Sequence, residues 1–143
     1  MIEIERVDHL GIRVVDGDRA LAFYTLLGFG EPYNVPDDDV TIIRNKQGVE
    51  INLITNGTHN SGGKNILMDV SEKYPGYTHV ALRVTSVVET IKFLQEHNIP
   101  ISGGPVELGK GNVSVFVRDP DRNVIELRGG AGEELPRDQY RPQ

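Results

Sequence analysis

The sequence predicts an α+β fold in which two tandem βαβββ modules form a single domain of residues 1–143. An internal repeat appears when the chain is aligned with itself at an offset of 70 residues. Both halves also begin with strand-like alternation and continue with helix-like spacing. Finally, each half carries one histidine near its start and one glutamate near its end. We expect the modules at residues 5–56 and 76–129, followed by a tail at residues 130–143.

The repeat aligns residues 8–29 with residues 78–99 without a gap. The identical pairs are His9/His79, Arg13/Arg83, Val14/Val84 and Phe23/Phe93. Beyond this segment the offset changes, because Glu126 lies 76 residues after Glu50 rather than 70. The loops that connect the later strands therefore differ in length between the halves.

A strand and then a helix are expected at the start of each half. Residues 9–14 and 79–84 alternate between apolar side chains and polar or small ones, as in a strand with one buried face. Asp16 or Asp18 can cap the first helix, which is expected to end at Gly28.

The second helix begins with a capping box formed by Ser86 and Glu89. It is expected to end near Asn98 and Pro100. Its predicted buried face consists of Val87, Ile91 and Leu94.

Three shorter strands are predicted after each helix from apolar runs bounded by turn residues. They are expected at residues 30–35, 39–44 and 49–54, and at residues 101–105, 113–118 and 124–128.

Composition and charge exclude several classes of function. The formal net charge of −6 argues against nucleic acid as a partner, because phosphates require a basic surface. No apolar stretch is long enough to span a membrane, and no secretory signal is evident at the N-terminus. The absence of cysteine excludes disulfides and thiolate ligands, and it is compatible with the cytoplasmic location that we expect. Any metal would be held by imidazole and oxygen.

A metal site is predicted from the residues that share one face of these strands. Strand alternation places His9 and Glu50 away from the apolar helix-packing face of the first half, and His79 and Glu126 away from that of the second. Two carboxylates close together in a partly buried site would be costly without a cation. Two imidazoles and two carboxylates suit one divalent ion of Ni, Co, Zn, Mn or Fe better than Ca.

The alternative for each of these four residues is a structural role, which is the commoner one for a single His or Glu. The repetition of the same residue types in both modules favours the metal site. His59 and His97 lack such repetition, and we expect both to be structural.

Arg13 shares the face of His9, about 13 Å along the strand at roughly 3.3 Å per residue. It can bind the anionic end of a small-molecule substrate, or it can pair with a neighbouring acidic residue. The sequence leaves both roles open.

Several segments resemble the vicinal oxygen chelate superfamily, which includes glyoxalases, bleomycin-resistance proteins and extradiol dioxygenases. They read VDHLGIRV with the later FYTLLGF, GVEINLI, GYTHVALRV and VFVRDPDRNVIELRG. The resemblance covers most of residues 5–129. It implies open, cup-shaped mixed sheets with a metal in the cup, and a homodimer in many members.

The order His9, Glu50, His79 and Glu126 resembles the ligand set of glyoxalase I. That resemblance implies a lyase or isomerase that transfers a proton through a metal-chelated enediolate on a small oxygenated substrate, either free or conjugated to a thiol. Glu126 or Glu50 would be the catalytic base.

Two further positions match residues that bind glutathione in glyoxalase I. Arg13 and Lys110 would accordingly bind substrate. The chain departs from that pattern at GYTH, which lacks an arginine before His79, and at Ile54, where an asparagine is expected. These departures leave the identity of the thiol open.

Two alternatives to the glyoxalase-type reaction come from the same superfamily. One is a ring-cleaving dioxygenase of the extradiol type, against which Glu50 as a fourth ligand argues. The other is a non-enzymatic protein that binds a drug or antibiotic in the cup, which would not need the metal ligands.

Overall fold

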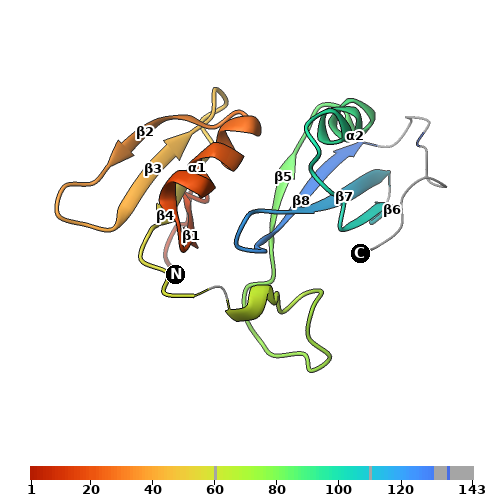
Figure 1. Ribbon diagram of the computed structural model, residues 1–143. Coiled ribbons are helices and arrows are strands. Elements are labelled where there is room, and N and C mark those ends of the chain that lie inside the picture. Colours follow the sequence, from red (N-terminus) through yellow and green to blue (C-terminus); the bar gives the residue numbers. More distant parts are fainter. Residues whose placement is uncertain (60, 110, 131–134, 136–143) are drawn as a thin grey trace. The chain divides into compact units, whose positions relative to one another are not determined.

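The computed structural model describes residues 1–59, 61–109, 111–130 and 135. The chain divides into two compact units, Met1–Gly63 and Lys64–Gln143. Each unit contains one helix and one four-stranded mixed sheet in the order βαβββ (Figure 1). The predicted fold class is confirmed.

The first unit is built on a sheet with the strand order β1-β4-β3-β2. Strand β1 runs parallel to β4, whereas the β4–β3 and β3–β2 pairs are antiparallel. Its elements are β1 (Leu10–Arg13), α1 (Gly17–Leu26), β2 (Gly30–Asn34), β3 (Val40–Arg44) and β4 (Glu50–Ile54), followed by a short 3-10 turn at Ser61–Gly63.

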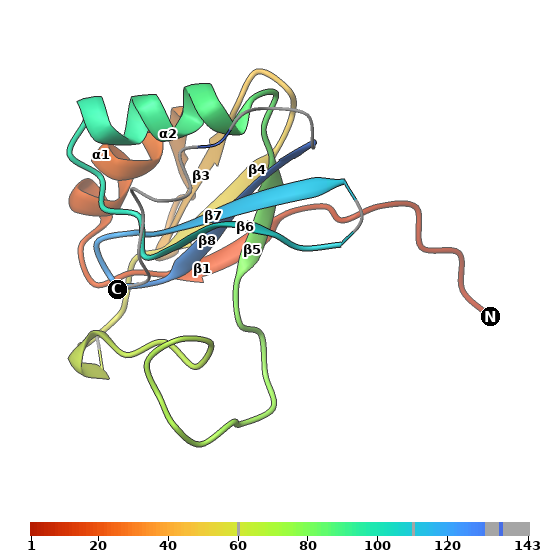
Figure 2. The ribbon, with the colours of Figure 1, turned by 90° about the vertical axis from the view of Figure 1, so that its right-hand side faces the viewer.

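The second unit repeats this topology with the strand order β5-β8-β7-β6. Strands β5 and β8 are parallel, and the other two pairs are antiparallel. Figure 2 shows α2 lying over one face of this sheet. The elements are β5 (Val80–Arg83), α2 (Val87–Glu96), β6 (Gly103–Glu107), β7 (Asn112–Arg118) and β8 (Val124–Gly130).

Both helices begin at side-chain caps. Asp16 accepts a hydrogen bond from the backbone N–H of Arg19 at 3.0 Å, and Ser86 accepts one from Glu89 at 3.1 Å. Each cap satisfies a backbone donor that has no partner within the helix. Asp16 is thus the first cap, and the Ser86 half of the predicted capping box is present.

The core lies between each helix and the face of the sheet that it covers. In the second unit, the buried side of α2 consists of the predicted residues Val87, Ile91 and Leu94. In the first unit, Tyr24 of α1 is fully buried, as are Ile51 and Leu53 of β4. Glu50 and Asn52 alternate with these two strand residues and therefore face the opposite side.

Strand β6 lies two residues later than predicted, at Gly103–Glu107 rather than at residues 101–105. Residues Ile101 and Ser102 are buried, but they precede the strand. The pairing with β7 is interrupted between Gly103 and Val106. Gly104 has φ +81°, and a Cβ atom there would lie 2.4 Å from the carbonyl oxygen of Ser114. The alternation of polar and apolar residues along a strand does not predict such a close approach between two backbone segments.

The turn before β8 is organised by Asp119. One of its oxygens accepts hydrogen bonds from the backbone N–H groups of Asp121 and Asn123, both at 2.9 Å. The Asn123 amide donates to the other oxygen at 2.9 Å. This turn brings β8 back antiparallel to β7 and so places Glu126 in the sheet.

A salt bridge connects the loop before β5 to β7 within the second unit. The guanidinium of Arg118 donates two hydrogen bonds to the Asp69 carboxylate, one of them at 2.7 Å. The side chain of Arg118 is buried. Asn65 also donates to the carbonyl oxygen of Thr78 at 3.3 Å, directly before His79. The loop is thereby attached to β7 at Asp69, and its start is joined to its own end through Asn65 and Thr78.

The pKa of Asp69 is lowered from its ordinary value of 3.8, mainly by the hydrogen bonds from Arg118, although burial acts in the opposite direction. A lowered pKa means that the folded state favours the carboxylate form. Its stabilising contribution is therefore complete above pH 3.8 and is lost as the pH falls through the lower folded-state value.

Within the part of the chain that the structure describes, neither helix has the length and apolar character that crossing a membrane would require.

We expect the substitution Asp69→Asn to lower the free energy of unfolding at pH 7 by about 1–3 kcal/mol, because the buried Arg118 loses a charged partner. The substitution Glu3→Gln, at an exposed position, is the control. Chemical denaturation at pH 7 and near pH 3 measures both. The difference between Asp69→Asn and the parent chain should shrink at the lower pH. If the difference in free energy of unfolding were as large near pH 3 as at pH 7, the stabilisation would not come from the ion pair between Asp69 and Arg118.

Candidate metal centre

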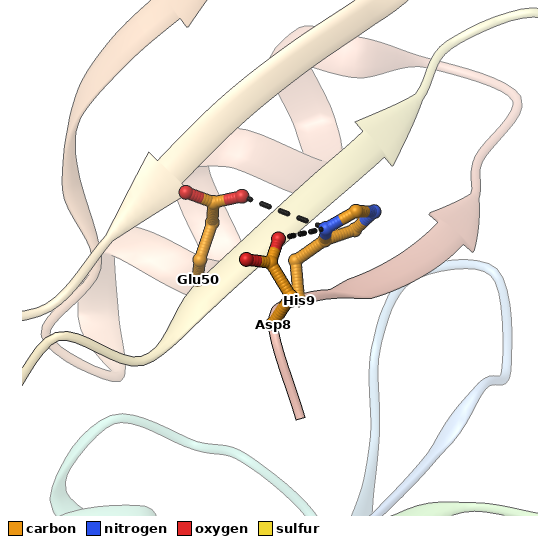
Figure 3. A group of neighbouring side chains, drawn as sticks. All are labelled: Asp8, His9 and Glu50. Carbon is orange, nitrogen blue, oxygen red and sulfur yellow. Dashed lines mark hydrogen bonds and ion pairs between the residues drawn. The ribbon is translucent and has the colours of Figure 1, made fainter. Parts of the chain in front are cut away.

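The first histidine and glutamate pair lies where β1 and β4 begin. These strands are parallel neighbours, with Leu10 opposite Ile51. His9 precedes Leu10 and Glu50 precedes Ile51, so the two side chains meet at the same end of the sheet. His9 Nδ1 lies 3.8 Å from Glu50 Oε2 (Figure 3).

Arg44 of β3 holds the carboxylate of Glu50 in place. It lies opposite Glu50 in the strand register. Its Nε and Nη2 atoms contact Glu50 Oε1 at 2.7 and 2.5 Å. Because the guanidinium occupies one oxygen, Oε2 is the oxygen presented to His9.

The second pair is closer. His79 Nε2 lies 2.9 Å from Glu126 Oε2. The other oxygen of Glu126 accepts a hydrogen bond from Ser114 Oγ at 2.5 Å, and Arg128 Nη1 lies 3.4 Å from it. Glu126 is 6% exposed, so these partners surround a buried carboxylate.

The two glutamates thus share one arrangement. In each, Oε1 is held by protein donors, while Oε2 faces a histidine nitrogen. Each pair therefore offers one oxygen and an imidazole at one place, which is the donor chemistry that divalent first-row metals prefer. The donor set fits a metal of the predicted kind.

The surroundings of Glu126 keep it ionised. Burial acts to raise its pKa, but the hydrogen bonds from Ser114 and His79 and the charges of His79 and Arg128 act more strongly, so its pKa is lowered from 4.5. A carboxylate that stays anionic while buried is suited to bind a cation or to accept a proton.

Arg13 makes its contact with an amide rather than with a glutamate. Its Nε donates to Asn56 Oδ1 at 3.1 Å. Arg83, the equivalent residue of the second module, donates in the same way to Asn112 Oδ1, also at 3.1 Å. Among the described residues, no acidic side chain forms the ion pair with Arg13 that the structural alternative required. Lys110 lies outside the described residues.

His97 has a structural role, as expected. It caps the end of α2, its Nδ1 donates to the carbonyl oxygen of Phe93 at 2.9 Å, and its ring stacks on that of Phe93.

Asp8 lies beside this first pair, although the sequence pattern does not single it out. His9 Nδ1 donates to Asp8 Oδ1 at 2.8 Å, and one ligand atom from each of Asp8, His9 and Glu50 lies within 4.8 Å of the others. The hydrogen bond from His9 is the largest cause of the lowered pKa of Asp8. Strand alternation would place adjacent residues on opposite faces, but both residues precede β1, where that rule does not apply.

Asn52 is likewise absent from the residues that the sequence predicts for the site. It lies two residues after Glu50 on the same face of β4, opposite Gly11 of β1. Its Oδ1 atom is buried, and no described residue donates a hydrogen bond to it. A buried acceptor without a partner costs about 1–3 kcal/mol, and such groups are rare outside functional sites.

Comparison with known proteins assigns the family. Residues 6–127 match the model of the Glyoxalase/Bleomycin resistance protein/Dioxygenase superfamily. The chain is also 30% identical over 130 residues to the glyoxalase domain-containing protein RDO1 of Mycosarcoma maydis, covering 88% of this chain and 69% of that protein. The protein belongs to this superfamily.

Solved structures share the same fold at lower identity. A glyoxalase/dioxygenase from Nostoc punctiforme is 21% identical with a TM-score of 0.69, covering 89% of this chain and 92% of that one. A glyoxalase family protein from Bacillus cereus is 19% identical with a TM-score of 0.66, covering 92% and 97%. The fosfomycin resistance protein FosX of Listeria monocytogenes is 17% identical with a TM-score of 0.64, covering 90% and 96%.

We expect Asn52→Leu to raise the free energy of unfolding by about 1 kcal/mol, because it removes a buried acceptor that lacks a partner. The matched control is Asn34→Leu, since Asn34 Oδ1 already accepts a hydrogen bond from Thr41 at 2.8 Å. Thermal and denaturant unfolding measure both variants. If Asn52→Leu proved less stable than the parent, the Asn52 amide would have a partner in solution.

Proposed function

We propose that the protein is a metal-dependent lyase or isomerase of the glyoxalase I type, which moves a proton between adjacent carbon atoms of a small oxygenated substrate. The observation that carries the proposal is the paired construction of the two histidine–glutamate sites, in each of which Oε1 of the glutamate is held by other protein donors and Oε2 faces a histidine nitrogen. Membership of the superfamily supports it, as does the order of the four residues along the chain.

The proposed ligands of one divalent ion of Ni, Co, Zn, Mn or Fe are His9, Glu50, His79 and Glu126, within one chain or between the chains of a homodimer. When bound, such an ion withdraws electron density from two adjacent substrate oxygens and so acidifies the neighbouring C–H bond.

Glu126 is the proposed base. It is buried and anionic, and Ser114 orients it through Oε1, so Oε2 is the atom that would accept the proton. Glu50 is the second catalytic carboxylate of the proposal.

Arg13 and Lys110 are the proposed substrate-binding residues. The hydrogen bond from Arg13 Nε to Asn56 leaves the two terminal nitrogens of the guanidinium for an anionic group. Arg13 would bind the end of the substrate remote from the reacting carbons, with Asn56 holding the side chain in position.

The test of the reaction is an isomerisation assay with hemithioacetals of methylglyoxal and a panel of thiols, including glutathione. We expect Glu126→Gln to lower turnover by about a thousandfold or more, with circular dichroism and the melting temperature of the fold preserved. The control is Glu96→Gln, at an exposed position near the end of α2. Removal of metal by a chelator should abolish turnover, and Ni or Co should restore it. Full turnover by Glu126→Gln, or by the metal-free protein, would refute the proposal.

We expect Arg13→Lys to raise KM about tenfold and to leave kcat within about twofold, because lysine cannot reproduce a two-point contact with a distant anionic group. Asn56→Ala should have a smaller effect in the same direction. Arg83→Lys changes the equivalent arginine–asparagine contact of the second module and serves as the control. It tests whether loss of any arginine–asparagine contact raises KM, or only loss of the contact at Arg13. Unchanged KM with a lower melting temperature would assign Arg13 to structure.

A further inference from the structure

Three potential metal-ligand atoms converge in the first module. His9 Nδ1 lies 2.8 Å from Asp8 Oδ1 and 3.8 Å from Glu50 Oε2 (Figure 3). Ligands about 2.1 Å from one metal ion are about 3 Å apart when they subtend a right angle. These two distances lie within about an ångström of that value, and one ligand atom from each of the three residues lies within 4.8 Å of the others.

The second module lacks this convergence because its equivalent residues differ. Thr78 occupies the position of Asp8 at the 70-residue offset, and its hydroxyl lies 2.8 Å from His79 Nδ1. Glu126 instead faces the other ring nitrogen, Nε2. Thr78 and Glu126 therefore contact different nitrogens of His79, whereas Asp8 and Glu50 both face the same nitrogen of His9.

Charge also distinguishes the two modules. In the first module, the carboxylates of Asp8 and Glu50 both face His9, and Arg44 contacts only the Oε1 atom of Glu50. The positive charges of Arg6 and Arg44 also act on Asp8. In the second, the one carboxylate is accompanied by Arg128. The side chains of Asp8 and His9 are 77% and 43% exposed, so a cation can reach them from solvent.

We propose that Asp8 is a third protein ligand, so that the first module binds a divalent cation through Asp8, His9 and Glu50 without needing His79 or Glu126. This inference rests on the proposed function in that it shares His9 and Glu50 with it. The cation would occupy His9 Nδ1 in place of the proton shared with Asp8, and that proton would move to Nε2 or to solvent.

A competing role for Asp8 is to orient His9 through the hydrogen bond alone, as carboxylates near metal sites commonly do. The two roles differ in their response to Asp8→Asn. The amide oxygen of asparagine still accepts the hydrogen bond from Nδ1, but it is a much poorer ligand for a first-row metal than a carboxylate.

The experiment uses the full-length protein and Co²⁺ alone, with affinity from equilibrium dialysis and coordination from the visible absorption spectrum. We expect Asp8→Asn to weaken Co²⁺ binding about tenfold or more and to alter the spectrum. The matched control Thr78→Val removes the neighbour of Nδ1 in the second module, and its spectrum should resemble that of the parent. His79→Ala should still bind one equivalent of Co²⁺, and the double variant Asp8→Asn/His79→Ala should not.

Parent-like affinity and spectrum for Asp8→Asn would overturn the inference and leave the proposed function intact. Loss of all Co²⁺ binding in His79→Ala would overturn it too, because the first module would then be insufficient. Conversely, Co²⁺ binding that depends on Asp8 in a protein without isomerase activity would support the inference and count against the proposed function. A parent protein that binds no Co²⁺ would refute both.

Discussion

The parallel pairing of the first and last strands within each module is the constraint on which the candidate site depends. Parallel strands cannot be joined by a tight turn, so a helix and two further strands intervene between β1 and β4, and between β5 and β8. The pairing nevertheless brings the beginnings of the two strands together. It places Glu50 beside His9, and Glu126 beside His79, although the members of the second pair are 47 residues apart. Without that register, neither pair would exist.

The protein groups around each glutamate have a common consequence, which is to leave one oxygen for the histidine or for a cation. They achieve it by different means. Arg44 contacts Glu50 from the adjacent strand at the edge of the site, where the arginine remains largely exposed. A buried hydroxyl, Ser114, contacts Glu126, with Arg128 nearby. A carboxylate that is already oriented loses less side-chain entropy when it binds a ligand, which favours affinity.

The repeat thus preserves the histidines and glutamates but not their neighbours. The change from a carboxylate at Asp8 to a hydroxyl at Thr78 replaces an anionic group with a neutral one at equivalent positions. Arg13 and Arg83, by contrast, keep the same type of amide partner in both modules. The two modules therefore differ at the residue that precedes each histidine.

The sequence by itself predicted the two modules, the Ser86 cap and the four candidate ligands, and it left the first cap between Asp16 and Asp18. These features depend on local periodicity, on capping chemistry and on a repeat, all of which are written along the chain. Only the tertiary structure decided that Arg44 would contact Glu50, that Asn56 would hold Arg13, and that no described residue would donate to Asn52 Oδ1. It also placed Asp8 beside His9, because two adjacent residues can face one point only where the chain is not yet a strand. Such contacts depend on strand register and on side-chain direction, which arise when distant segments pair and which no single segment encodes.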